Sequence, residues 1–341
     1  MKLITLVFLV GIANITFAQN GAKDYTVYHK GVIKAEEAIF IKKDSIGGLK
    51  IFKSTFENYD FVFVDDCIEA FELALYFKQD KYAMYFIQKA MENGFELKCL
   101  KYLRCFCPCN GGIDYKTKIT VFDDFVEKNK DFLEQYSDKC YGKYAARIDK
   151  YLLQALIKRH VKEQLFKNYH RGLCLIENPK EEQEFQFKEY GKICDDNLRF
   201  MDSLAMNKVY IGERNLGLYT DKQIETLQLP YSMQKYNAYL LAYYHLSKDI
   251  HVPLVEEVEY FDKGFVYNMW YHNVKSHDTL AKYSAEAIKL GYLHPREYAT
   301  LTFNKPGGTP DSLHLRLAPV GKKLTDTRKL DEIREQRCLL T

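Results

Sequence analysis

The stretch from Asp65 to Gly94 constrains the fold more than any other part of the chain. It contains two amphipathic segments separated by a polar break at residues 78–81. Apolar residues recur in each segment with the period of a helix that buries one face. Asp65 and Asp66 are expected to cap the first helix, and Gly94 to end the second in the left-handed conformation. The pattern predicts a helical hairpin.

Two small residues of the second helix, Ala83 and Ala90, are seven positions apart. Small side chains at this spacing let two helices approach closely. The segment therefore resembles one unit of a tetratricopeptide-like repeat. Because no clear second copy follows at the same period, the resemblance implies a helical domain with repeat-like packing rather than a full superhelical array.

The rest of the chain also favours helices, because the Val/Ile alternation typical of strands is scarce. Further helices are expected at residues 30–43, 46–58, 120–136, 144–167, 188–204, 232–246, 279–290 and 329–337. A turn is expected at Glu177–Glu184, around Pro179, and a short strand at Ser312–Leu317. The predicted fold class is mainly α: a helical-hairpin, repeat-like N-terminal domain, then a second mostly helical domain with at most a short strand pair.

Residues 1–19 are typical of an export signal. Lys2 precedes an apolar run over residues 3–10, and small residues lead to Ala18. The run is shorter than the roughly 20 residues that a membrane-spanning helix needs. We therefore expect cleavage near Ala18, a periplasmic or secreted protein, and no transmembrane segment in the mature chain. The predicted domains are a repeat-like domain at 20–142 and a mainly helical domain of unknown function at 143–341.

Charge and motifs narrow the possible functions. The formal net charge of +3 is too small for the basic footprint that binds nucleic acid non-specifically. The sequence has no G-x-S-x-G, G-x-x-x-x-G-K or G-x-G-x-x-G motif, which lowers the expectation of a hydrolase or a nucleotide-binding enzyme. The 27 tyrosines suit both packed helix seams and recognition surfaces. No cofactor is predicted.

Nine cysteines occur in a chain that we expect to be exported, where disulfides can form. They are Cys67, Cys99, Cys105, Cys107, Cys109, Cys140, Cys174, Cys194 and Cys338. The odd number leaves at least one thiol unpaired or intermolecular, and the pairing stays open. The densest run has C-x-C spacing and lacks the C-x-x-C pairs of a zinc site, so no metal is predicted there.

The C-terminal half carries an ordered set of short motifs. They are Asp196-Asn197-Leu198, Gly212, His245, the run Gly291–Ala299 and Leu330–Arg334. In this order they resemble an uncharacterised bacterial family, a domain of unknown function found in exported proteins behind helical repeats. The chain departs from that family at residues 207–209, at Tyr244 and at residues 302–304. The resemblance therefore implies an architecture and no chemistry.

Among the polar residues, His245 ends an apolar helix face and is the candidate for a general base. The alternative, a partly buried histidine bonded to a backbone carbonyl, is favoured. Asn197, His245 and Arg296 are the predicted binding residues, and the sequence leaves open whether they line a common cavity. His272 and His277 are five residues apart, so they do not share a helix face, and the cluster they form with Asn273 and Asp278 predicts no metal site. The carboxylates of Asp195, Asp196 and Glu213 do not stand out from an ordinary acidic surface.

The leading hypothesis is an exported, non-catalytic module that binds a protein or peptide. The alternative is a hydrolase with a pocket around His245. Oligomeric state and ligand are left open by the sequence.

Overall fold

The computed structural model describes residues 23–97, 115–159, 162–163, 180–218, 226 and 277–295. Helices account for 79% of the described residues, and this part of the chain contains no strand. The mainly α fold class predicted from sequence is therefore confirmed. The predicted export signal and the expected strand at 312–317 lie outside the described residues.

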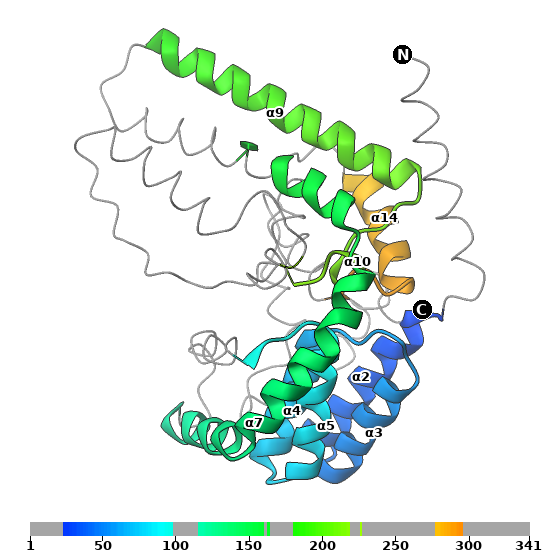
Figure 1. Cartoon of the computed structure of the whole chain (residues 1–341). Helices are drawn as coiled ribbons and strands as arrows, with labels where there is room; N and C mark the ends of the chain where they lie inside the picture. Colours follow the sequence, from blue (N-terminus) through cyan, green and yellow to red (C-terminus); the bar gives the residue numbers. More distant parts are fainter. Residues whose placement is uncertain are drawn as a thin grey trace.

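The helices follow one another along the chain and are labelled in Figure 1. They are α2 (Tyr25–Phe40), α3 (Ser45–Glu57), α4 (Val64–Tyr76), α5 (Asp80–Glu92), α7 (Tyr115–Arg147), α9 (Lys180–Met206), α10 (Glu213–Leu216) and α14 (His277–Lys289). Residues 150–159 are also helical. The main packed pairs are α2 with α3, α4 with α5, and α5 with α7. The predicted hairpin is thus one of two consecutive hairpins, α2–α3 and α4–α5, and α7 packs against the second.

Helices α2 and α3 begin at aspartates that the sequence analysis did not use. Asp24 accepts a hydrogen bond from Thr26 N at 2.8 Å, and Asp44 accepts one from Gly47 N at 2.8 Å. These N-caps satisfy amides that have no partner within the helix. As a result α2 starts five residues before the expected Lys30.

The expected caps of α4 are wrong. Phe63 occupies the N-cap position and makes no side-chain cap bond, whereas Asp65 and Asp66 lie in the first helical turn. Asp66 is fully buried, and its side chain contacts Tyr28 and His294 in the interior of the protein instead of capping the helix. At the other end of the hairpin the prediction is confirmed, because Gly94 has a φ of 97°.

Helix α7 is longer than expected, and α9 begins earlier. The expected break between residues 136 and 144 is absent, because α7 runs for 33 residues to Arg147. The next helical segment begins at Asp149, whose side chain accepts a hydrogen bond from Leu152 N at 3.0 Å. A turn is expected over Glu177–Glu184, but α9 begins at Lys180, so the prediction is wrong for residues 180–184. Lys, Glu and Gln are good helix formers, so a polar run of this composition continues a helix readily.

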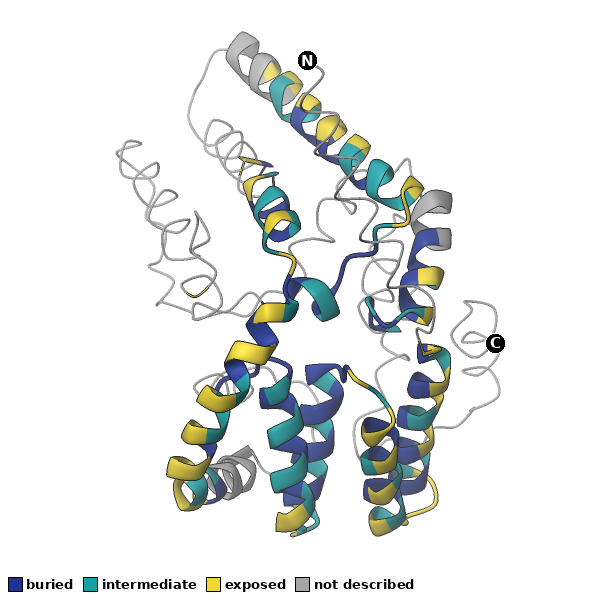
Figure 2. Cartoon of the chain, turned by 45° about the vertical axis from the view of Figure 1, so that its right-hand side comes forward, coloured by how far each residue is buried: buried dark blue, intermediate teal, exposed yellow. Residues whose placement is uncertain are grey.

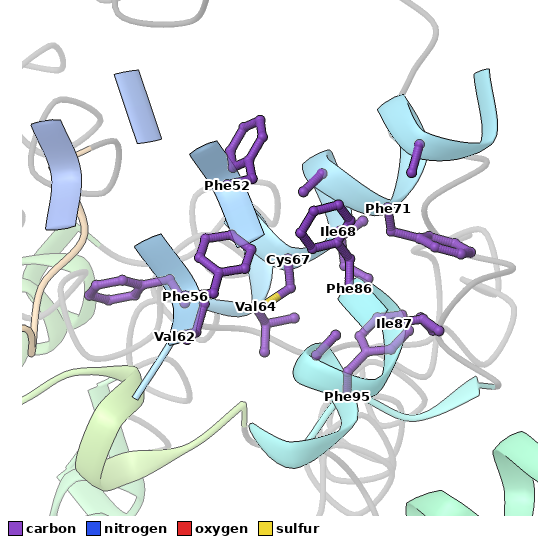
Figure 3. Packing of buried hydrophobic residues seen from close by; sticks show 14 of the residues in the cluster. Phe52, Phe56, Val62, Val64, Cys67, Ile68, Phe71, Phe86, Ile87 and Phe95 are labelled. Atoms are coloured by element: carbon purple, nitrogen blue, oxygen red, sulfur yellow. The ribbon is translucent and has the colours of Figure 1, made fainter. Parts of the chain in front are cut away.

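Two clusters of buried apolar side chains form the interior. The first lies among α2, α3, α4 and α5, and Figure 3 shows some of its members, including Phe52 and Phe56 of α3, Phe71 of α4 and Phe86 of α5. The ring of Phe86 meets those of Phe52 and Phe56 edge to face, at centroid distances of 6.2 and 5.7 Å. Ala83 and Ala90 are fully buried in this cluster, where small side chains let the helices approach.

The second cluster lies among α7, residues 150–159, α9 and α14. Helix α7 contributes to both clusters, with Phe125 and Leu133 in the first and Tyr141 and Tyr144 in the second. Figure 2 shows the dark blue buried faces turned toward neighbouring helices. No helix among the described residues is both long and apolar enough to span a membrane.

The close approach of Gly94 to α7 gives a test of the packing. A Cβ at residue 94 would overlap the Tyr144 ring, and the positive φ disfavours any L side chain. We expect Gly94→Ala to lower the free energy of unfolding by roughly 2 kcal/mol or more. The measurement is urea unfolding followed by circular dichroism.

Gly142→Ala is the matched control. This glycine lies inside α7, and a Cβ there would meet nothing within 4 Å. The substitution should leave stability unchanged or raise it by about 0.5–1 kcal/mol, since alanine is the better helix former. Equal losses in both variants would contradict the packing described here.

Candidate functional site

Several of the candidate residues proposed from sequence lie outside the described part of the chain. His245, His272, Asn273 and Arg296 all lie outside it. His277 and Asp278 begin α14. Of the three predicted binding residues only Asn197 can therefore be placed, and the binding role of His245 and Arg296 stays a prediction.

Asn197 lies on α9 with 2% of its surface exposed. Its Nδ2 donates a hydrogen bond to Oε2 of the buried Glu163 at 2.6 Å. Beside it, Arg159 forms an ion pair with Asp196 at 2.6 Å, and this guanidinium holds the pKa of the Asp196 carboxyl below its usual range. The Arg159 guanidinium also lies over the Phe200 ring at 4.2 Å from its centroid. These contacts fasten α9 to the segment that precedes it.

A second polar group lies where the hairpins meet the segment that follows α14. It consists of Tyr28 and His29 on α2, Asp66 on α4, and His294, and is called the Asp66 cluster below. Asp66 Oδ2 accepts a hydrogen bond from the Tyr28 hydroxyl at 2.8 Å, and Asp66 Oδ1 lies 3.1 Å from His294 Nε2. The exposed fractions of His29, Asp66 and His294 are 4%, 0% and 5%.

The cluster has aromatic surroundings. The His29 and His294 rings meet edge to face with centroids 5.3 Å apart, and Phe63 lies 5.5 Å from the first and 4.9 Å from the second. Burial, together with the neighbouring Asp66 charge, raises the pKa of Tyr28 well above 10. The Tyr28 hydroxyl therefore stays protonated and acts as a hydrogen-bond donor to the carboxylate.

A tight turn after α14 carries His294 into the cluster. Gly291 ends the helix with a φ of 75°, and the amides of Tyr292 and Leu293 both donate to Ala287 O. Gly291 packs on the Tyr25 ring, where a Cβ would not fit without a shift. Leu293 is fully buried in the second apolar cluster. The run from Gly291 thus ends α14 and positions a buried imidazole.

Two residues of α10 make a further junction with the N-terminal hairpins. Glu213 Oε1 accepts a hydrogen bond from Val64 N at 2.8 Å, across 149 residues of sequence. It thereby supplies an acceptor at the start of α4, where no side-chain cap bond is made. Arg214 forms an ion pair with Asp60 at 2.8 Å and lies over the Tyr25 ring at 5.3 Å. Glu213, which looked like an ordinary surface carboxylate, is a buried long-range cap.

The cysteines of the described part offer no reactive centre. Three of the cysteines are described, and of these Cys67 and Cys140 are free thiols. Burial raises the pKa of the Cys67 thiol, and the Asp66 and Glu213 charges raise it further. A thiol with a raised pKa is a weak nucleophile. The other six cysteines lie outside the described residues, so disulfide formation stays a prediction.

The Asp66 cluster offers two kinds of chemistry. A carboxylate beside an imidazole can orient a general base, but here both groups are buried, and the nearby Tyr28 hydroxyl donates to the same carboxylate. Alternatively, His29, Asp66 and His294 each offer one ligand atom to a metal ion, and these atoms lie within 4.8 Å of one another. Among the described residues this is the only such group of three.

Sequence reasoning missed His29 and His294 and assigned Asp66 to a helix cap. The three come from distant parts of the chain, so no short motif unites them. Comparison with known proteins finds no family model, curated protein or solved structure that matches this chain. The class of the protein therefore comes from its fold alone: it is a mainly α protein built from packed helical hairpins.

The long-range cap on α4 can be tested at Glu213. We expect Glu213→Ala to lower the free energy of unfolding by roughly 1–3 kcal/mol, because the buried Val64 amide loses its acceptor. Glu213→Gln, which keeps an oxygen acceptor, should lose less. The measurement is chemical denaturation of the full chain. The control is Glu127→Ala on the exposed face of α7, and a loss there as large as at residue 213 would contradict the assignment.

Asn197 can be tested in the same way. Asn197→Ala should destabilise the fold by roughly 1–3 kcal/mol, because it removes the donor to a buried carboxylate. The exposed neighbour Asp195 provides the matched variant, and Asp195→Ala should change stability by no more than about 0.5 kcal/mol. Thermal and urea unfolding measure both. Unchanged stability in Asn197→Ala would mean that this residue does not hold the helices together.

Proposed function

We propose that this protein is a non-catalytic module that presents a helical surface to a protein or peptide partner. The observation that carries the proposal is the consecutive packing of α2–α3, α4–α5 and α7 over one apolar cluster. Helix pairs stacked side by side create extended surfaces that suit extended ligands. Figure 1 shows these helices next to one another in the lower part of the view.

The hydrogen bonds of the buried polar side chains support the same proposal. Asp66, Asn197 and Glu213 are buried, and each forms a hydrogen bond with another group of the protein: Tyr28, Glu163 and the Val64 amide. A polar side chain engaged in this way stabilises the fold and is not presented to a substrate. The proposed role in binding therefore rests on the outer surface of the helices. No observation favours the hydrolase, whose candidate residue His245 lies outside the described part.

Exposed apolar side chains provide positions at which binding can be tested. Tyr76 on α4 and Phe132 on α7 have exposed fractions of 55% and 48%. Both belong to the packed N-terminal helices. Tyr151 and Met206 are also exposed, at 83% and 76%, but lie on the helical segment 150–159 and at the end of α9. The two pairs therefore form a matched set of surface variants.

We expect the double variant Tyr76→Ala, Phe132→Ala to weaken partner binding at least about tenfold, because exposed aromatic side chains are common binding hot spots. The variant Tyr151→Ala, Met206→Ala should bind within about twofold of the native chain. Partners are captured on the full chain from the exported fraction, identified by mass spectrometry, purified and titrated. Both variants should stay folded, since surface substitutions change stability by about 0.5 kcal/mol or less.

The proposal fails if no partner binds saturably, or if the two double variants lose affinity equally. A substrate whose turnover by the full chain is abolished in His245→Ala would instead support the hydrolase.

A further inference from the structure

We propose that His29, Asp66 and His294 bind one divalent transition-metal ion of the zinc class. This inference goes beyond the proposed function, because it concerns a buried part of the protein that a partner does not reach. It rests on the three ligand atoms that the fold brings within 4.8 Å of one another.

The donor set suits such an ion. Imidazole nitrogen is a preferred ligand of zinc, and a carboxylate oxygen commonly completes a set with two histidines. Calcium and magnesium prefer sites made of oxygen ligands alone. Three protein ligands leave one tetrahedral position for a water molecule. The residues therefore select for zinc and related ions over the alkaline-earth cations.

The distances between the three ligand atoms are close to those around a tetrahedral zinc ion. Zinc lies about 2.0–2.1 Å from nitrogen and oxygen ligands, which places tetrahedral ligands about 3.3–3.5 Å from one another. His294 Nε2 and Asp66 Oδ1 are already 3.1 Å apart. The group as a whole spans up to 4.8 Å. Movements of about one ångström, within the reach of side-chain rotation, bring all three atoms to bonding distance.

The surroundings already hold the ligands. The Tyr28 hydroxyl donates to Asp66 Oδ2 at 2.8 Å, which leaves Oδ1 facing His294. Groups that hydrogen-bond a ligating carboxylate orient it and raise metal affinity. His294 follows Leu293, which is fully buried, and His29 lies on the well-packed helix α2. Tyr28 is thus a positioning residue for the proposed site.

The metal would fasten three parts of the fold together. Its ligands come from α2, from the first turn of α4 and from the turn after α14, and Asp66 and His294 are 228 residues apart. An ion that binds the folded chain and not the unfolded one stabilises the fold by mass action. The competing explanation is that Asp66 and His294 form only a buried hydrogen-bonded pair, which needs no ion.

The test uses the full chain without a histidine tag. It is unfolded in denaturant that contains a chelator, and is then refolded with or without Zn²⁺. We expect one zinc per chain after desalting and a melting temperature several degrees higher than that of the metal-free protein, from mass action at excess metal. Mg²⁺ and Ca²⁺ should produce neither effect. Metal content is measured by mass spectrometry, and ligand type by X-ray absorption.

Variants test which residues bind the zinc ion. Tyr28→Phe should weaken zinc binding about 10–100-fold while the fold is kept. His29→Gln and His294→Gln should abolish stoichiometric binding, whereas His277→Gln, a histidine at the start of α14, should bind as the native chain does. If a ligand variant fails to fold, the stoichiometry and absorption spectrum of the native chain together with Tyr28→Phe decide the question.

Three results would overturn the proposal. The first is a refolded native chain that retains no zinc, which leaves Asp66 and His294 as a hydrogen-bonded pair only. The second is an absorption spectrum with sulfur ligands, which places the ion on cysteines. The third is equal zinc affinity in the native chain and in Tyr28→Phe.

Discussion

The burial of the Asp66 carboxylate is the constraint on which the junction between the N-terminal hairpins and the turn after α14 depends. A carboxylate removed from water is costly unless hydrogen bonds or opposite charge compensate it. Here the compensation comes from Tyr28 on the neighbouring α2 and from His294, far along the chain. The first turn of α4 therefore reaches its full stability only when the turn after α14 is in place.

Other contacts make the same connection by different means. Glu213 gives the Val64 amide an acceptor, and Arg214 reaches both Asp60 and the Tyr25 ring. Helix α7 adds an apolar link, since its side chains enter both buried clusters. Because polar and apolar links coincide, the hairpins and the later helices support one another, and a substitution at the junction acts on both.

Local signals explain how much of this fold the sequence could predict. Helical periodicity located α3, α4, α5 and α14 closely, because each buries one regular face and ends at a recognisable break. The start of α2 and the continuity of α7 were missed because a cap and a polar run are weaker signals than an apolar stripe. Contacts such as Glu213 with Val64 span 149 residues. No local rule encodes such a pairing, since it exists only once the helices have packed.

The same reasoning separates the two proposed roles of the molecule. A binding surface needs exposed side chains on rigid supports, whereas the Asp66 cluster is enclosed by aromatic rings and engages residues of the protein itself. An ion held there would act on a partner only through the rigidity of the hairpins. Rigid helices reduce the conformational entropy lost when a partner binds. A metal at the junction would therefore raise the affinity of the outer surface for a partner without contacting that partner. Loss of the metal would make the hairpins more mobile, and partner binding would weaken as that mobility increases.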